Sequence, residues 1–274
     1  MLSTVLAVLA TPVHETLFPY SWGTTLHAFR ISLVFHTNLQ ATNRRISWGA
    51  HMLGFLLMSW GGTLASHSLL SLPPPQLYTV GPWINYSAAH LLFTLLFHYF
   101  PVVHPSFTNA ILSPLDGLLR ANSVLYTTTL LANPSVNQLL EGSPLFHFIL
   151  GAAASAGGGL VGGSFSLWTP DWQFSMPPPL RTDSWGLWST LDIWAGGVVA
   201  LTYGILIAHP AFQPLRAYLT LAEVKPSSIP AARATSATIM VALYGLRAVV
   251  ATVPSKAAKP PLNTEQSGKK VKTQ

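Results

Sequence analysis

Residues 46–70 read ISWGAHMLGFLLMSWGGTLASHSLL, a stretch without a single Asp, Glu, Lys or Arg. It belongs to a longer charge-free run, because none of the 70 residues between Arg45 and Asp116 carries a formal charge. An α-helix needs about 20 predominantly apolar residues to cross a bilayer. The quoted stretch is therefore long enough for one membrane-spanning helix, and the whole run is long enough for several.

The rest of the chain has the same character. Only 8% of the 274 residues are charged and 50% are hydrophobic, whereas an ordinary soluble domain is about 25% charged. Strands are not expected, because an open sheet leaves backbone groups unpaired in lipid. We predict an all-α polytopic membrane protein and exclude a soluble enzyme. No GxSxG, P-loop or paired-carboxylate motif is present, so we expect no enzymatic activity. Further charge-free runs cover residues 121–140, 142–170, 193–215 and 234–246.

Proline and glycine clusters divide residues 1–253 into seven predicted transmembrane helices. Arg44 and Arg45 place the first loop in the cytoplasm, since short cytoplasmic loops are enriched in basic residues. Arg216 and Arg233, near the sixth loop, point the other way. With seven spans the basic tail, residues 254–274, is cytoplasmic, and its composition predicts disorder rather than nucleic-acid binding. The predicted spans lie near residues 16–37, 47–70, 83–103, 112–132, 145–167, 187–208 and 233–253, with a short interfacial helix near 215–224.

An internal repeat organises these spans. HMLG at 51–54 is followed seven residues later by Gly61 and Gly62, and FILG at 148–151 is followed at the same distance by Gly158 and Gly159. These motifs lie in spans two and five. We therefore predict two three-helix repeats, at about 16–103 and 112–208, followed by a seventh helix at 233–253. Because each repeat has an odd number of spans, the second is inverted relative to the first.

Two interpretations of the repeated glycines stay open. Glycine-interrupted helices at matching positions of inverted repeats indicate a substrate or ion path near the midplane, where freed carbonyls could bind a cation. Alternatively, the GxxxG spacing of Gly158 and Gly162 allows close helix packing. Both interpretations can hold together.

Charged residues within membrane spans are costly and are functional candidates. Asp116 and Arg120 are four residues apart, which suits an ion pair along one helix. Asp192 has no cation nearby in sequence, so it either pairs with Arg30 or Arg247 or lines an ion path. These five residues are the candidates for an ion path or for buried ion pairs.

The sequence gives no sign of a metal site or cofactor. It has no cysteine, and its ten histidines form no HExxH or related motif. We therefore expect the histidines to be hydrogen-bonded packing residues.

Several short motifs, taken in order, resemble the trimeric intracellular cation (TRIC) channels over residues 15–253. They are Phe18-Pro19, RRISW at 44–48, SPLD at 113–116, the glycines at 157–159, WTP at 168–170 and KPSS at 225–228.

The resemblance implies a homotrimer in the endoplasmic reticulum or nuclear membrane, with one pore in each subunit. It implies permeation by potassium or other monovalent cations as the counter-ion flux for calcium release. The pore-helix glycines would be Gly61, Gly62, Gly157, Gly158 and Gly159.

In one feature the chain departs from the family. Animal members have a Lys-Glu-Val signature with extra basic residues in span four, where phosphoinositide binds. Here residues 118–124 read LLRANSV, so Arg120 is the one candidate for a lipid phosphate and phosphoinositide control is not carried over. The alternatives to a channel are a secondary transporter of a small solute, which an inverted repeat suits equally well, and a non-conducting membrane scaffold.

Overall fold

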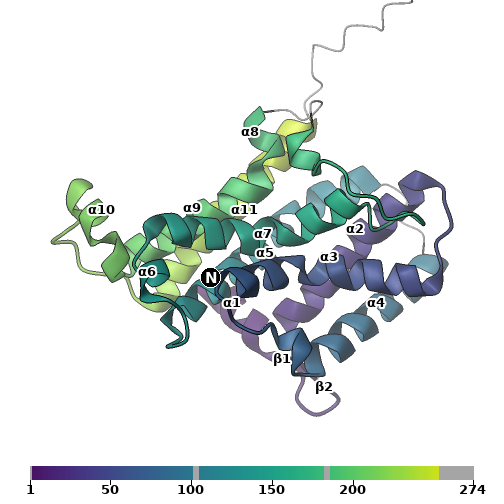
Figure 1. The fold of residues 1–274 in the computed structure, drawn as a ribbon, viewed down its shortest axis with the longest axis horizontal. Helices are drawn as coiled ribbons and strands as arrows, with labels where there is room; N and C mark the ends of the chain where they lie inside the picture. Colours follow the sequence, from purple (N-terminus) through teal and green to yellow (C-terminus); the bar gives the residue numbers. More distant parts are fainter. Residues whose placement is uncertain (1, 101–104, 182–185, 253–274) are drawn as a thin grey trace, which may run out of the picture.

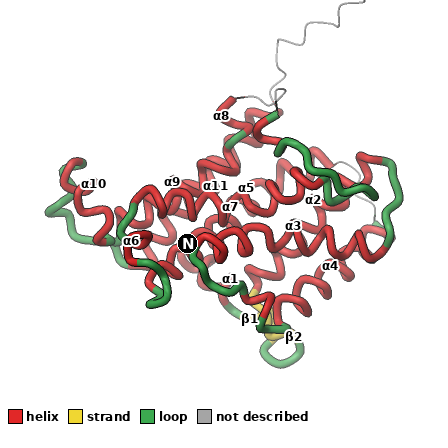
Figure 2. Tube along the Cα trace, viewed as in Figure 1, coloured by secondary structure: helices red, strands yellow, loops and turns green. Residues whose placement is uncertain are grey.

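The computed structural model describes residues 2–100, 105–181 and 186–252 (Figure 1). Helices dominate this part of the chain, and two short strands lie at one edge of it (Figure 2). The long helices are α2 (Trp22–Thr42), α3 (Trp48–Leu69), α4 (Gly81–Tyr99), α5 (Pro105–Thr129), α7 (Pro144–Phe165), α9 (Leu191–Leu206) and α11 (Ile229–Thr252). The shorter ones are α1 (Leu2–Ala10), α6 (Gln138–Glu141), α8 (Gly186–Ser189), α10 (Gln213–Tyr218) and the 3-10 turns η1 (Pro75–Leu77), η2 (Leu130–Ala132), η3 (Pro178–Leu180) and η4 (Pro210–Phe212).

Each predicted span overlaps one long helix, but fewer helices than seven meet the length and apolarity of a bilayer span. In the described part of the chain, α7 and α11 do so. A third span results if α9 and the segment Pro210–Tyr218, bent by 97° relative to it, cross together. The protein thus has helices able to cross a membrane, whereas seven crossings stay a prediction.

Two features near the N-terminus differ from expectation. Strands β1 (Pro12–His14) and β2 (Phe18–Ser21) form an antiparallel pair, so the expectation of no strands is wrong for this segment. The hairpin precedes α2, where its backbone groups pair with each other outside the helical bundle. Helix α1 was not predicted either, and it buries Leu6 and Leu9 in the core.

Local sequence sets where the long helices begin. Ser21, Ser47 and Ser143 precede α2, α3 and α7, and each side chain accepts a hydrogen bond from the main-chain N–H three residues on, at 3.2–3.3 Å. Serine in this position satisfies an N–H that has no partner within the helix. Asn43 and Ser166 end α2 and α7 with left-handed backbone, at φ 50° and 51°.

Arg216 and Arg233, which pointed against the predicted orientation, are used inside the fold. Arg216 is only 4% exposed, and its guanidinium donates to the carbonyls of Ile205, Leu221 and Val224 at 2.6–2.8 Å. Arg233 donates to the Asn122 side chain at 3.3 Å. Arg216 therefore stabilises the connection between α9 and α11, and Arg233 joins α11 to α5. These contacts explain their place in the sequence without reference to a membrane side.

The outer face of α4 is apolar. Four leucines in two adjacent rows, Leu91, Leu92, Leu95 and Leu96, are 44–54% exposed. Exposed apolar patches of this kind mark surfaces that meet a partner or lipid. This face fits a helix that borders the membrane interior.

The long helices pack as two related triplets. Within the first, α2 contacts α3 and α4, and α3 contacts α4; within the second, α5 contacts α7 and α9, and α7 contacts α9. Between the triplets α3 packs on α7 and α2 on α5, while α11 packs on α5 and α9. This is the set of contacts that a twofold relation between the triplets would give. The inverted repeat itself, with its bounds, stays a prediction.

Glycine residues form the contact where α3 and α7 cross. A Cβ added at Gly61 would lie 2.8 Å from the Gly157 carbonyl oxygen, and one at Gly157 would lie 2.7 Å from the Gly61 carbonyl oxygen. Both helices run without interruption through these residues. Gly61 and Gly157 therefore serve close backbone approach, whereas the ion-path role of the repeated glycines stays a prediction.

Adjacent glycines of α7 allow a matched test of this contact. We expect Gly157→Ala to lower the free energy of unfolding by about 1–3 kcal/mol, the usual cost of overpacking. Gly159→Ala is the control, because its Cβ would meet nothing within 4 Å, and alanine favours a helix over glycine by about 1 kcal/mol. Thermal unfolding in detergent, followed by circular dichroism, separates the two. Equal melting temperatures for Gly157→Ala and wild type would contradict the tight crossing.

Candidate functional site

The structure brings the five candidate ionisable residues into one chain of alternating charge. Arg30 Nε in α2 lies 3.8 Å from Asp116 Oδ1 in α5, and Arg120 Nε lies 3.3 Å from Asp116 Oδ2. On its other side, Arg120 Nη1 lies 3.5 Å from Asp192 Oδ1 in α9. Asp192 Oδ2 is 3.0 Å from Arg247 Nη1 in α11. We call this series the ion-pair chain.

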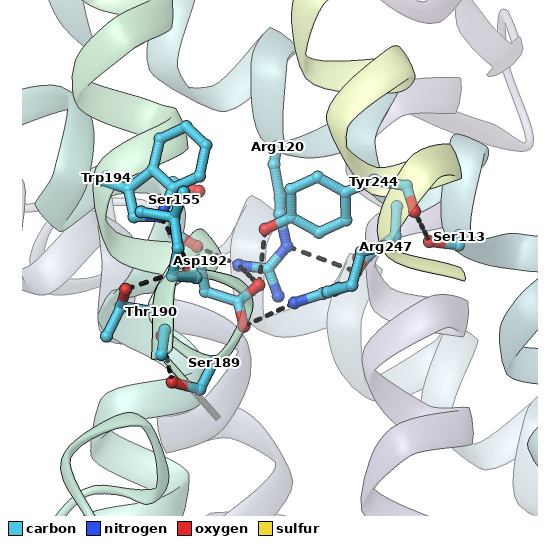
Figure 3. Close-up of polar contacts among 12 residues, drawn as sticks. Ser113, Arg120, Ser155, Ser189, Thr190, Asp192, Trp194, Tyr244 and Arg247 are labelled. Carbon is cyan, nitrogen blue, oxygen red and sulfur yellow. Dashed lines mark hydrogen bonds and ion pairs between the residues drawn. The ribbon is translucent and has the colours of Figure 1, made fainter. Parts of the chain in front are cut away.

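Arg120 is the central member of the ion-pair chain (Figure 3). Besides its two carboxylates, its Nη1 donates to the Ser155 carbonyl oxygen of α7. Its guanidinium carbon also lies 5.4 Å from the centre of the Tyr244 ring. One side chain of α5 therefore contacts α7, α9 and α11.

Tyr244 and Ser113 fix the outer end of the ion-pair chain. The Tyr244 hydroxyl donates to Asp192 Oδ1 at 2.5 Å, and the Arg247 guanidinium carbon lies 4.4 Å from the centre of the Tyr244 ring. The Ser113 hydroxyl donates to the Tyr244 carbonyl at 2.7 Å and ties α5 to α11 (Figure 3). Asp192 is thus held by two arginines and one tyrosine.

Burial decreases along the ion-pair chain. The side chains of Arg30 and Asp116 are 9% exposed, Arg120 is 18% exposed, and Asp192 and Arg247 are each 28% exposed. Three guanidiniums and two carboxylates leave one formal positive charge. Buried charges need partners, and the alternation gives each carboxylate an arginine on both sides.

A cavity of about 620 Å³ ends at the ion-pair chain. Its wall is formed by helices of both triplets, by α1 and by the segment around β2. Polar side chains on this wall include Ser59, Thr63, Asn85 and Ser123, while Asp116 and Arg120 also line it. A cavity with several polar groups can hold water.

The positions of the lining residues on each helix indicate from which end of the bundle the cavity extends inward. On α2 the lining residues run inward from Gly23 to Ile31, and on α5 they run from Tyr126 to Asp116. Pro75, the first residue of η1 in the connection between α3 and α4, also lines the cavity. The cavity therefore begins at the end of the bundle that carries the residue 71–80 connection and stops at the ion-pair chain in its interior.

The candidate glycines divide between the helix crossing and the cavity. Gly62, Gly158 and Gly159 line the cavity. Gly61 and Gly157 lie at the α3–α7 contact and are not among its lining residues. Gly62 and Gly158 also approach the facing helix closely, whereas the Cβ position of Gly159 is open.

Three members of the site, Tyr244, Ser113 and Ser155, were missed in the sequence. Tyr244 stands three residues before Arg247, a spacing that places both on one helix face, and this was the available signal. Ser155 contributes its main-chain carbonyl, which no side-chain pattern could reveal.

No protein-family model, curated protein or solved structure matches the chain. The resemblance to TRIC channels stays a prediction from the motifs alone.

The buried carboxylate at the inner end allows a test of the ion-pair chain. We expect Asp116→Asn to cost about 3–5 kcal/mol of unfolding free energy, because it removes the buried carboxylate that Arg30 and Arg120 share. The control is Asp171→Asn, since Asp171 is 72% exposed and lies 4.0 Å from Arg44. An exposed pair of this kind contributes about 0–1 kcal/mol. Denaturation in detergent should separate the variants, and equal stabilities would rule out the energetic role given to Asp116.

Proposed function

We propose that the protein is a monovalent-cation channel of the TRIC type, with one ion path inside each subunit. The polar cavity that enters between the two triplets and ends at Arg120 is the observation that carries the proposal. The motif resemblance adds potassium as the main ion, a trimeric assembly and an intracellular membrane where the flux balances calcium release.

The cavity supports an ion path for physical reasons. Hydroxyl and amide groups along its wall can replace part of the water shell of a cation. Irregular or polar groups at membrane depth are tolerated where they line a wet space. Gly159 lines the cavity and has open space at its Cβ position, so no side chain narrows the cavity at this point of α7.

Arg120 is the proposed barrier. It lies at the inner end of the cavity, and beyond it lie the half-buried Asp192 and Arg247. A cation that moves inward meets a guanidinium, which is repulsive at short range. Conduction would therefore require Arg120 to leave its contacts with Asp116, Asp192 and the Ser155 carbonyl.

The polar cavity that ends at Arg120 also favours a second candidate function, a secondary transporter of a small solute. A cavity that opens at one end and is closed by an ion-pair barrier is what alternating access requires in one of its two states. A non-conducting scaffold has less support, because helix packing alone does not require a polar cavity between the triplets.

Currents and fluxes distinguish these candidates. Purified protein in a planar bilayer should give unitary potassium currents if it is a channel. A carrier should give saturable counterflow in liposomes without unitary events. A scaffold should give neither, and that result would reject the proposed function.

Filling the cavity should block transport. We expect Gly159→Trp to reduce potassium flux into liposomes at least about tenfold, because its side chain would enter the cavity. Gly245→Trp is the matched control: Gly245 is also a helical glycine with nothing within 4 Å of its Cβ position, but it does not line the cavity. The two variants should fold equally well. Equal flux in both would remove the cavity from the path.

Removing the charge of the barrier should increase transport. Arg120→Gln leaves Asp116 with Arg30 and Asp192 with Arg247, so both carboxylates keep an arginine. We expect potassium flux to rise at least about tenfold, since a unit charge close to the path raises the barrier by more than about 1.4 kcal/mol. The charge-conserving Arg120→Lys should stay near the wild-type flux. An unchanged flux in Arg120→Gln would show that Arg120 is not the barrier.

A further inference from the structure

Three histidines from the three helices of the first triplet meet beyond the inner end of the cavity. They are His36 in α2, His51 in α3 and His90 in α4, and one ring nitrogen of each lies within 4.8 Å of the others. We propose that these histidines form a binding site for one divalent transition-metal ion of the zinc class. The site is separate from the ion path, and the inference does not rest on the proposed function.

The spacing of the ring nitrogens fits such an ion. His90 Nε2 and His51 Nδ1 are 3.2 Å apart. Two nitrogen ligands of a tetrahedral zinc ion, each about 2.0–2.1 Å from the metal, are about 3.3 Å apart. These two imidazoles thus need little movement to share an ion, and His36 closes the triangle.

Ser32 fixes the tautomer of His90. The Ser32 hydroxyl lies 2.8 Å from the Ala28 carbonyl oxygen and 2.8 Å from His90 Nδ1. A carbonyl can only accept, so the hydroxyl hydrogen goes to Ala28 and His90 Nδ1 must carry the proton donated to Ser32. His90 Nε2 is then unprotonated and accepts the hydrogen bond from His51 Nδ1. An ion that binds both nitrogens takes the place of this proton, which moves to the other ring nitrogen of His51.

Thr94 does the same for His36. Its hydroxyl donates to the His90 carbonyl at 2.8 Å and lies 3.0 Å from His36 Nε2. By the same argument His36 Nε2 carries the proton, which leaves Nδ1 unprotonated and able to bind an ion. A hydroxyl or carbonyl that holds the second ring nitrogen is the usual support of a metal-binding histidine.

Aromatic rings hold all three imidazoles in place. The His90 ring stacks on Phe55 with 3.8 Å between centres, and the His36 ring stacks on Phe97 at 5.4 Å. The Trp48 ring stacks on His51 at 5.4 Å. Rings that are already fixed lose little freedom when an ion binds, which favours affinity.

The chemistry of the three ligands restricts the ion. Neutral imidazoles suit zinc, cobalt, nickel and copper, whereas magnesium and calcium prefer oxygen ligands. Three protein ligands leave a fourth position for water. A groove beside the site, lined by His36, Gln40, Thr94, Phe97 and His98, gives an ion a route from the surface.

A cobalt titration tests the site, because tetrahedral cobalt absorbs visible light and zinc displaces it. The full chain, purified without a histidine tag, should bind one Co²⁺ and lose the absorption when Zn²⁺ is added. His36→Phe should weaken binding at least tenfold while it keeps an aromatic ring against Phe97. Thr94→Val leaves all three ligands and should weaken binding about 10–100-fold, the effect of removing a supporting hydrogen bond.

His98→Gln is the matched control, because His98 lines the same groove but is outside the cluster. It should bind Co²⁺ as the wild type does. Absence of a tetrahedral spectrum in wild-type protein would overturn the inference. So would wild-type affinity in both His36→Phe and Thr94→Val. If His36→Phe does not fold, Thr94→Val decides alone.

Discussion

The placement of Arg120 between two carboxylates is the interaction on which the interior of this protein depends. Through Asp116 it reaches Arg30 on α2, and through Asp192 it reaches Arg247 on α11. Charges away from water are costly unless they are paired, so the helices that carry these groups must stay together. The alternation of sign joins helices of both triplets to α11 and also closes the inner end of the cavity. Stability and the proposed barrier are thus properties of the same side chain.

The glycines of α7 serve close helix packing and also line the cavity, the two interpretations that the sequence left open. Gly157 faces α3 and permits backbone contact, whereas Gly159 lines the cavity and has open space at its Cβ. Residues two apart on an α-helix are about 200° apart around its axis, so they lie on nearly opposite faces. A run of glycines therefore gives close packing on one side of α7 and an unobstructed wall on the other. Gly158, between these two residues, lines the cavity and also lies close to the Met58 carbonyl of α3, so it serves both roles.

The first triplet carries different chemistry at its two ends. Hydroxyl and amide groups, together with the imidazoles of His27 and His67, line the cavity at the end where α2 begins, and a cluster of three imidazoles lies further along the same helices. The two clusters share no residue, since His36, His51 and His90 are not in the cavity wall. An ion held by the three imidazoles would fix α2, α3 and α4 relative to one another. The proposed metal site would then stabilise the wall of the proposed ion path without lying in it.

Sequence alone determined the helical class and the approximate place of each long helix, because long hydrophobic runs bounded by proline and glycine are local signals. It also identified all five members of the ion-pair chain, since charges are conspicuous in an apolar sequence. The pairing of Asp192 with Arg247, the α1 helix, the hairpin before α2 and the cavity needed the tertiary structure. The three histidines are the clearest case: they stand at positions 36, 51 and 90, a spacing with no local pattern. Only the packing of three helices brings their rings together, because contacts between distant segments depend on how whole faces fit.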